Sequence, residues 1–248
     1  MARTALITGA SAGIGAAVAK RLSRRGYRLI LLARREDRLQ ALRTECLELG
    51  APEVQVAALD ISDRKACEDF FKSTRELHVL INSAGLAAGT DPMDRAKLSD
   101  WEAMVETNVM GLLYITRLAV DSLKATRGHI VNLGSVAGHW TYPGGGVYCA
   151  TKAAVRALSE GLRLDLMGTG VRITNIEPGM VETEFSVVRY GGDKGKADKV
   201  YSGMEPLTAD DVAESIEWCL DRPARVNIQE MMIFPTDQAG VGFVNRRP

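Results

Sequence analysis

The stretch Thr8-Gly9-Ala10-Ser11-Ala12-Gly13-Ile14-Gly15 lies between a short β-rich run, 4–8, and an amphipathic stretch, 14–25. Glycines allow a tight turn and a close approach of the backbone to a ligand, and the N-terminus of the following helix favours a pyrophosphate. The spacing is G-x-x-x-G-x-G rather than the commoner G-x-G-x-x-G, and a glycine-rich turn alone can be purely structural. The order of strand, turn and helix at the start of a βαβ unit favours a dinucleotide-binding turn.

Beyond this turn, short β-rich runs alternate with longer stretches of helical period along the whole chain. The run 29–32, Leu-Ile-Leu-Leu, is apolar on both faces, as a sheet covered by helices on both sides requires. The expected strands are 4–8, 28–33, 53–59, 79–82, 129–133, 172–176 and 228–233, and the expected helices are 14–25, 36–49, 63–76, 99–124, 147–167 and 209–221. This alternation predicts an α/β fold, a single Rossmann-type doubly wound parallel sheet of about seven strands with helices on both faces.

The composition excludes several classes of protein. The 248 residues contain 31 Lys and Arg against 31 Asp and Glu, so the sequence lacks the basic character of a nucleic-acid-binding protein. The longest aliphatic run, 29–33, is far too short to span a membrane, and the N-terminal residues lead directly into the glycine turn without a signal-peptide region. We therefore expect a small-molecule substrate, with no nucleic-acid or membrane partner.

The four cysteines are widely scattered and form no CxxC pair or Cys/His cluster. This spacing supports neither a disulfide framework nor a metal site, so we expect no metal and a reducing, cytoplasmic environment. The cysteines are Cys46, Cys67, Cys149 and Cys219.

No shift in composition marks a domain boundary, so the sequence predicts one dinucleotide-binding and catalytic domain, residues 1–248. Residues 180–207 interrupt the alternation, with several glycines among Lys and Asp and no clean period. A loop of this length inside a compact domain is usually functional or disordered. Its position predicts a substrate lid.

The second expected strand ends at Ala33 and is followed by Arg34 and Arg35. A site for NAD has an acidic residue here, about 20 residues after the glycines, to hold the ribose 2′-hydroxyl. Two guanidinium groups suit the 2′-phosphate of NADP instead. The alternative is that they only solvate the next helix beside Glu36 and Asp37, although cations are disfavoured at helix N-termini. We predict NADP as the cofactor, with Arg34 as the main contact and Arg35 assisting.

Asp60 follows the third expected strand, at the edge where ligands meet an open α/β sheet. Its carboxylate is a candidate contact to the adenine. A structural interpretation stays equally open, because Asp60 or Ser62 can cap the following helix.

Tyr148 and Lys152 are four residues apart on the expected helix 147–167, so they share one face. A phenol titrates near pH 10 in isolation, and a nearby ammonium favours the phenolate, so we expect Lys152 to lower the pKa of Tyr148. Tyr148 would then exchange a proton with a substrate oxygen while a cofactor carries the hydride. Ser135 ends the fifth expected strand thirteen residues earlier, and its hydroxyl can hold the same oxygen.

A second pair, Tyr190 and Lys194, has the same spacing. Gly191-Gly192 lies between them and disfavours a helix, so these two side chains need not share a face. No serine or other hydroxyl precedes Tyr190 by thirteen residues, where Glu177 stands instead. We therefore place the chemistry at Tyr148.

With these motifs in order, the chain resembles the short-chain dehydrogenase/reductase family over essentially its whole length. The family's N-N-A-G motif corresponds to 82–85, with Ser83 in place of the second asparagine, and its Pro-Gly motif to 178–179. The resemblance implies a catalytic tetrad of Asn108, Ser135, Tyr148 and Lys152, with Asn108 distorting its helix and holding a water that links Lys152 to solvent. It also implies a homotetramer. The cofactor-binding residues that it implies, together with the analysis above, are Gly9, Ser11, Gly13, Ile14, Gly15, Arg34, Arg35, Asp60, Ile61, Asn82, Ala84, Gly85, Tyr148, Lys152, Pro178, Gly179, Val181 and Thr183.

A narrower resemblance, to bacterial NADP-dependent 3-hydroxy acid dehydrogenases, concerns the substrate. It rests on 101–104, 144–148, 176–179, 183–189 and 195–197, whereas 179–183 is one residue shorter than in those enzymes. It implies oxidation of serine, L-allo-threonine and related 3-hydroxy acids, or reduction of malonic semialdehyde. Two alternatives stay open: a reductase of another small aldehyde or ketone, such as a sulfonated aldehyde, and a non-catalytic dinucleotide sensor on the same fold.

An acid substrate needs a cation for its carboxylate. The pocket segment 86–89 carries no charge, and His139, Trp140 and Tyr142 supply at most a neutral donor. Arg189 follows the semi-apolar stretch 185–188, which can form a short amphipathic turn over the nicotinamide. A guanidinium there would bind a carboxylate with two parallel hydrogen bonds. We predict substrate contacts by Arg189, Ser135 and Tyr148. The alternative for Arg189 is a solvated charge paired with Asp193.

Overall fold

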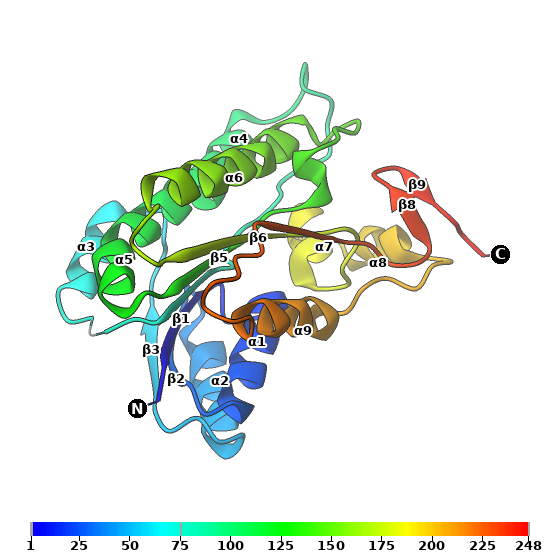
Figure 1. The fold of residues 1–248 in the computed structure, drawn as a ribbon. Helices are drawn as coiled ribbons and strands as arrows, with labels where there is room; N and C mark the ends of the chain where they lie inside the picture. Colours follow the sequence, from blue (N-terminus) through cyan, green and yellow to red (C-terminus); the bar gives the residue numbers. More distant parts are fainter. Residues whose placement is uncertain (1, 75, 248) are drawn as a thin grey trace.

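A seven-stranded sheet forms the centre of the computed structural model, which describes residues 2–74 and 76–247 (Figure 1). Its strand order is β3-β2-β1-β4-β5-β6-β7, and all six neighbouring pairs are parallel. The strands are β1 Thr4–Thr8, β2 Arg28–Ala33, β3 Val54–Ala58, β4 Val79–Asn82, β5 His129–Leu133, β6 Arg172–Pro178 and β7 Glu230–Ile233. The order changes direction between β1 and β4, which confirms the predicted doubly wound α/β fold.

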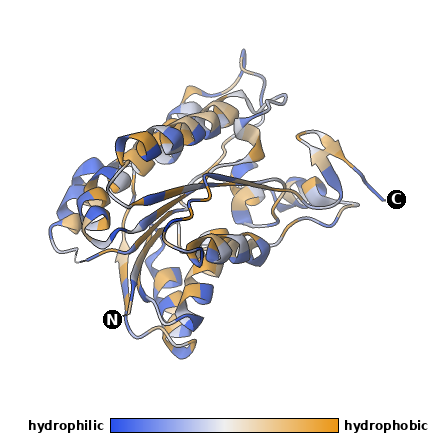
Figure 2. Cartoon of the chain, viewed as in Figure 1, coloured by the Kyte–Doolittle hydropathy of each residue, from blue (hydrophilic) through white to orange (hydrophobic). Residues whose placement is uncertain are grey.

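Helices cover both faces of the sheet (Figure 1). One layer consists of α1 Gly13–Arg24, α2 Glu36–Glu48 and α9 Ala209–Leu220. The other contains α3 Arg64–Phe71, α5 Leu112–Thr126 and α6 Gly146–Asp165, with α4 Leu98–Val105 packed against α6. Hydrophobic residues gather in the strands and on the helix faces that meet them (Figure 2). No helix of the described residues is long and apolar enough to cross a membrane.

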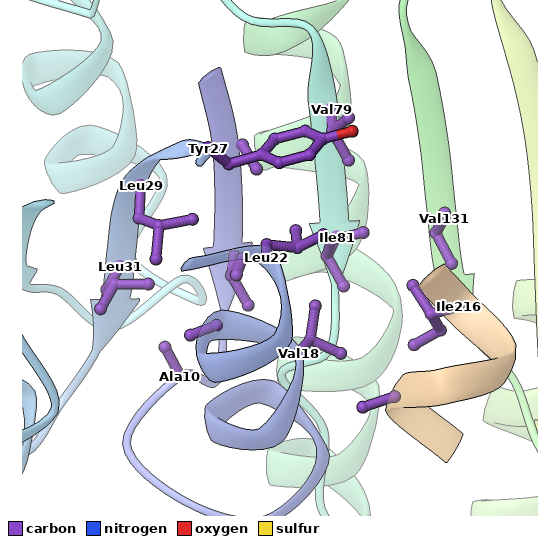
Figure 3. Packing of buried hydrophobic residues seen from close by; sticks show 14 of the residues in the cluster. Ala10, Val18, Leu22, Tyr27, Leu29, Leu31, Val79, Ile81, Val131 and Ile216 are labelled. Carbon is purple, nitrogen blue, oxygen red and sulfur yellow. The ribbon is translucent and has the colours of Figure 1, made fainter. Parts of the chain in front are cut away.

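The two layers are held by alternate residues of the same strands. Leu31 and Ile81 pack with Val18 and Leu22 of α1 in one cluster, which Figure 3 shows. The residues next to them in the strands, such as Leu32, belong to the cluster on the opposite face. Each fully buried side chain of this kind contributes about 1.5–3 kcal/mol. This explains why the strands are apolar on both faces.

The predicted helix 99–124 consists of three elements. After α4 the chain forms a π-helix, Glu106–Gly111, before α5 begins. Asn108 lies inside the π-helix, so the local distortion implied by the family resemblance is confirmed. The structure has a shorter helix, α3, where 63–76 was predicted. It begins after Asp63, whose side chain caps it by accepting a hydrogen bond from the Ala66 backbone N–H at 3.0 Å, and it ends at Phe71. Position 75, inside that prediction, lies outside the described residues.

Residues 180–207 contain two short helices that the periodicity did not predict, α7 Glu184–Arg189 and α8 Lys194–Tyr201. Gly191 and Gly192 separate them, with φ values of 61° and 96° that favour glycine. A small hairpin, β8 Gln238–Gly240 and β9 Phe243–Val244, was also not predicted. Figure 1 shows α7, α8 and the hairpin together at one end of the sheet. The C-terminal tail holds α8 there, since Arg246 Nη2 donates to the Val200 carbonyl at 3.0 Å.

A buried histidine in β5 gives the fold a pH-dependent stability. Burial, assisted by the charge of Arg172, lowers the pKa of His129 to about 3, and its Nε2 lies 2.8 Å from Thr174 Oγ1. An unfolded histidine titrates near 6.5, so below that pH the unfolded state binds a proton that the folded state does not. The stability contribution is therefore complete above pH 6.5 and is lost at about 1.4 kcal/mol per pH unit as the pH falls toward 3.

We expect His129→Gln to remove this part of the acid sensitivity. The free energy of unfolding, measured with urea at several pH values between 7 and 5, should fall less steeply in the variant than in the wild type. Between pH 6 and 5 the two slopes should differ by about 1.4 kcal/mol per unit. Parallel curves would show that His129 titrates in the folded protein as it does in the unfolded chain.

Candidate active site

A cavity of about 740 Å³ lies at the carboxyl ends of the parallel strands. Such ends meet at one edge of the sheet, where ligands of doubly wound proteins bind. Each of the first six strands is followed by at least one residue that lines the cavity: Gly9 after β1, Arg34 after β2, Asp60 after β3, Ser83 after β4, Gly134 after β5 and Gly179 after β6. The topology thus brings together groups that are up to 170 positions apart in the sequence.

The glycine turn forms one wall of the cavity and can accept a dinucleotide only without side chains. A Cβ on Gly9, whose φ is +66°, would lie 2.7 Å from the Ala84 Cα. A Cβ on Gly15 would lie 2.5 Å from the Gly9 carbonyl oxygen. Ala12 precedes α1 and offers no side-chain cap, so the first N–H groups of this helix are left for a ligand. Gly9, Ser11, Gly13 and Ile14 line the cavity, and Gly15 packs behind them.

Arg34 and Arg35 lie beside this turn. Arg34 is 68% exposed, and its Nη1 lies 3.8 Å from Asp60 Oδ2. Arg35 donates from Nε and Nη2 to Ser11 Oγ, both at 3.3 Å, and pairs through Nη1 with Glu184 Oε2 at 2.9 Å. Both guanidinium groups thus lie at the cavity, and the exposure of Arg34 is also what the alternative of a solvated helix start expects.

Asp60 does not cap the following helix. Its Oδ1 accepts hydrogen bonds from the backbone N–H and the hydroxyl of Ser62, at 3.0 and 2.7 Å, while Asp63 provides the cap of α3. Asp60 and Ile61 both line the cavity. The structure thus leaves one Asp60 oxygen facing Arg34 and removes the capping alternative.

The end of β4 divides into a buried and an accessible part. Asn82 is buried, and its Nδ2 donates to Thr116 Oγ1 and Asn132 Oδ1, both at 2.9 Å. Its side chain therefore binds neighbouring elements rather than facing the cavity, whereas Ser83, Ala84 and Gly85 line it. Thr8 Oγ1 accepts hydrogen bonds from the backbone N–H groups of Ser83 and Ala84 at 3.1 Å, which holds this end of β4 against β1.

Ser135, Tyr148 and Lys152 lie together in the opposite part of the cavity. Lys152 is buried, and its Nζ donates to the Leu133 carbonyl at 2.7 Å and lies 5.8 Å from the centre of the Tyr148 ring. Ser135 Oγ accepts a hydrogen bond from the Ala137 N–H at 3.1 Å. Tyr190 and Lys194, the competing pair, lie on separate elements, at the end of α7 and the start of α8.

Asn108 lies behind this group and is not among the cavity-lining residues. Its Oδ1 accepts from the Leu86 N–H and its Nδ2 donates to the Leu86 carbonyl, both at 2.8 Å. A Cβ on Gly85 would lie 3.2 Å from Asn108 Oδ1 and 3.5 Å from Lys152 Nζ. Asn108 thus fixes the loop after β4, and it faces the same side of Gly85 as Lys152 Nζ.

Burial dominates the electrostatics of the tyrosine and the lysine. It raises the pKa of Tyr148 well above its usual value, and nearby Tyr142 adds to this, while Ser135 and the charge of Arg189 act in the opposite direction. Burial also lowers the pKa of Lys152 to about 8. The net shift of Tyr148 is therefore opposite to the one expected from Lys152: desolvation of the phenolate dominates, and the groups that lower the pKa are Ser135 and Arg189.

Arg189 reaches the same part of the cavity from α7. Its Nη1 donates to Tyr142 Oη at 2.8 Å, and its Nη2 donates to the Gly144 carbonyl at 3.4 Å. Asp193 instead caps α8 and pairs with Lys196 at 3.4 Å, so the alternative pairing of Arg189 with Asp193 is wrong. Sequence reasoning missed the contact to Tyr142, since nothing local connects two residues 47 positions apart.

Other residues of the cavity were also missed. Phe185 of α7 lies with its ring 5.5 Å from the Tyr148 ring, and Glu184 faces Arg35. Gln238 Oε1 accepts a hydrogen bond from the Met180 N–H at 2.8 Å and lines the cavity. The sequence signal for the first two was their place in the expected lid; Gln238 lies in the hairpin, which had no signal.

One group of possible metal ligands lies outside the cavity lining. His139, Glu177 and Glu230 place their ligand atoms within 4.8 Å of one another. His139 Nε2 and Glu177 Oε2 are 2.8 Å apart, and Asn175 Nδ2 donates to the other Glu177 oxygen at 2.8 Å. Glu177 is thus satisfied by protein partners, and the pair joins the segment after β5 to β6.

The geometry can be compared with known proteins. Residues 3–190 match the short chain dehydrogenase family. The chain belongs to this family. It is 45% identical over 247 residues to a serine 3-dehydrogenase of Agrobacterium fabrum, with 98% of both chains covered. It is 46% identical over 244 residues to the NADP-dependent 3-hydroxy acid dehydrogenase YdfG of Salmonella typhi, covering 96% of this chain and 97% of the relative.

Solved structures of the family have the same fold. The closed form of a serine dehydrogenase in complex with NADP+ aligns with a TM-score of 0.92 and 43% identity, covering 99% of this chain and all of the other. An alcohol dehydrogenase from the archaeon Thermococcus sibiricus, in complex with 5-hydroxy-NADP, aligns with a TM-score of 0.84 and 31% identity, covering 100% and 99% of the two chains.

The glycine turn provides a direct test of the cavity as a dinucleotide site. In Gly15→Ala the new Cβ meets the backbone of Gly9, which cannot yield without moving the turn. We expect the affinity for NADPH, measured by fluorescence titration, to fall at least about tenfold, a loss of about 1.4 kcal/mol. The matched control is Gly161→Ala in α6, where a Cβ meets nothing within 4 Å. Wild-type affinity in Gly15→Ala would contradict this placement.

Proposed function

We propose that this protein is an NADP-dependent oxidoreductase that interconverts a small 3-hydroxy acid, of the serine, L-allo-threonine or 3-hydroxypropionate type, and its 3-oxo form. The observation that carries the proposal is that one cavity joins the glycine turn, with Arg34 and Arg35 beside it, to Ser135, Tyr148 and Lys152. The names of the two relatives above, at 45% and 46% identity, support the substrate class.

The chemistry divides between the cofactor and the chain. NADP, when bound, carries the hydride. Ser135 holds the substrate oxygen, and Tyr148 passes a proton to it or takes one from it. The raised pKa of Tyr148 keeps the phenol protonated, which suits a donor to a carbonyl oxygen. Lys152 supplies positive charge behind the phenol, and Asn108 positions the loop beside Lys152.

The cofactor assignment uses both ends of the cavity. The α1 N-terminus faces the pyrophosphate, Arg34 with Arg35 binds the 2′-phosphate, and Asp60 and Ile61 contact the adenine. Asn82 acts from within the fold by supporting the end of β4. The residues assigned to the turn and the nicotinamide end are Gly9, Ser11, Gly13, Ile14, Gly15, Ala84, Gly85, Tyr148, Lys152, Pro178, Gly179, Val181 and Thr183.

The wider organisation follows from the same proposal. Residues 1–248 form one dinucleotide-binding and catalytic domain, and 180–207 is a lid that carries α7 and α8 over the cavity. Arg189 at the end of α7 binds the substrate carboxylate. The enzyme acts in the cytoplasm as a homotetramer, as members of the family often do.

A substrate panel with both cofactors tests the function. Oxidation of L-serine, L-allo-threonine and 3-hydroxypropionate, and reduction of malonic semialdehyde, a sulfonated aldehyde and neutral aldehydes, are followed by the absorbance of the reduced cofactor. We expect the 3-hydroxy acids with NADP to be preferred. Preference for a sulfonated or neutral aldehyde would replace the substrate class. NADPH binding without turnover of any compound would indicate a dinucleotide sensor.

Tyr148→Phe should nearly abolish turnover of the best substrate, because it removes only the hydroxyl that carries the proton. General acid–base catalysis typically contributes about 10²–10⁴-fold, so we expect kcat to fall by at least about a hundredfold. NADPH affinity should stay within about threefold of the wild type, since the ring remains. Substantial turnover in this variant would assign the proton transfer to another group.

Arg189→Met should raise KM for a 3-hydroxy acid at least about tenfold, equivalent to about 1.4 kcal/mol, and hardly affect a neutral alcohol of similar size. Tyr142→Phe is the control, because it removes the hydrogen bond from Arg189 Nη1 while the guanidinium stays. Its effect on KM should be smaller than that of Arg189→Met. If Arg189→Met raises KM equally for acid and neutral substrates, the residue orders the lid and does not bind the carboxylate.

A further inference from the structure

Glu184 is the first residue of α7, and the proposed function assigns it no role. Its Oε2 pairs with Arg35 Nη1 at 2.9 Å, and its Oε1 pairs with Arg38 Nη1. Both arginines lie at the start of α2, about 150 positions earlier in the chain. One carboxylate of segment 180–207 is therefore shared between two guanidinium groups of the cofactor-binding half.

The same place is where the 2′-phosphate of NADP has to be recognised. Arg35 also donates to Ser11 Oγ of the glycine turn, so its guanidinium lies between the turn and Glu184. Ser11, Arg35 and Glu184 line the cavity, whereas Arg38 does not. The hydrogen bond from Arg38, together with Arg35, holds the pKa of Glu184 below its usual value, so a negative charge stands at an anion site.

We propose that Glu184 is an internal counter-ion of the 2′-phosphate site, one that competes with NADP for Arg35. This inference rests on the proposed function and identifies a residue that sets cofactor preference. A phosphate dianion binds guanidinium groups bidentately and more strongly than one carboxylate oxygen does, so it takes Arg35 when NADP binds. Arg38 then keeps Glu184 in place. NAD offers a hydroxyl at this position and does not disturb the pair.

Glu184 therefore lowers the affinity for NADP and leaves that for NAD unchanged, and Arg38 limits the loss by sharing the carboxylate. A role of Glu184 only as a tether of α7 would affect both cofactors alike, because both fill the cavity below α7. A direct contact of Arg38 with the phosphate would not depend on Glu184. The three possibilities make different predictions for a double-mutant cycle.

The cycle uses the full-length protein and compares the wild type, Glu184→Gln, Arg38→Gln and the double variant. Dissociation constants for NADPH and NADH are measured by fluorescence titration, and thermal unfolding checks that each variant is folded. Glu182→Gln is the matched control, because it removes the same charge two positions before Glu184. Glu182 is exposed and does not line the cavity. Its affinities should stay within about twofold of the wild type.

In Glu184→Gln the dissociation constant for NADPH should fall at least about threefold and that for NADH should stay within about twofold, because only the phosphate loses a competitor. In Arg38→Gln the constant for NADPH should rise at least about threefold, since Glu184 then pairs with Arg35 alone. In the double variant the dissociation constant for NADPH should equal that of the Glu184→Gln variant within about twofold.

Two results would overturn the inference. Equal shifts for NADPH and NADH in Glu184→Gln would make the residue a tether, and a loss of NADPH affinity in Arg38→Gln that is the same in both backgrounds would make Arg38 a direct phosphate ligand. Failure of the proposed function looks different: the wild type itself would then bind NADPH no more tightly than NADH.

Discussion

The register between β1 and β4 is the constraint on which the rest of the site depends. It places Thr8 opposite Asn82, so that Thr8 Oγ1 accepts two backbone hydrogen bonds from the end of β4 and Gly9 meets Ala84. With a Cβ at Gly9, the turn and the end of β4 could not both stay where they are. Because all seven strands are parallel, every further group that follows a strand arrives at the same edge, and the cavity is formed by the topology rather than by any one loop.

The sequence predicted the elements that are decided locally. Strands apolar on both faces and helices of clear period were found within one or two residues, since their burial leaves a regular pattern. The prediction of secondary structure failed where the element was short or its end was not marked by the hydrophobic pattern. The helix 63–76 ends early, and α7 and α8 escaped detection because helices of six and eight residues with flanking glycines carry too little periodic signal. The π-helix around Asn108 has no periodic signal either, and only the family resemblance pointed to it.

The candidate site divides in the same way. The sequence was sufficient to recognise the glycine turn, Ser135, Tyr148 and Lys152. Each of them belongs to a motif that is compact in sequence and lies at the end of a strand or on one face of a helix. Asn82 is also part of a compact motif, yet its side chain points to Thr116 and Asn132, since a strand-end residue faces either the ligand or the core and spacing does not tell which. The ion pairs of Glu184 and the contact between Arg189 and Tyr142 join distant segments, and no spacing rule encodes such contacts.

The charges at the two ends of α7 act on Tyr148 and on the arginines beside the glycine turn. Burial raises the pKa of Tyr148 and lowers that of Lys152, so it disfavours the charged form of both members of the pair that the motif brings together. The residue outside the motif whose charge favours the phenolate is Arg189, and it lies at the end of α7. The same helix begins at Glu184, roughly 8 Å away along its axis, among the arginines beside the glycine turn. The position of one short helix therefore affects both Tyr148 and the arginines beside the glycine turn, two groups that lie far apart in the sequence.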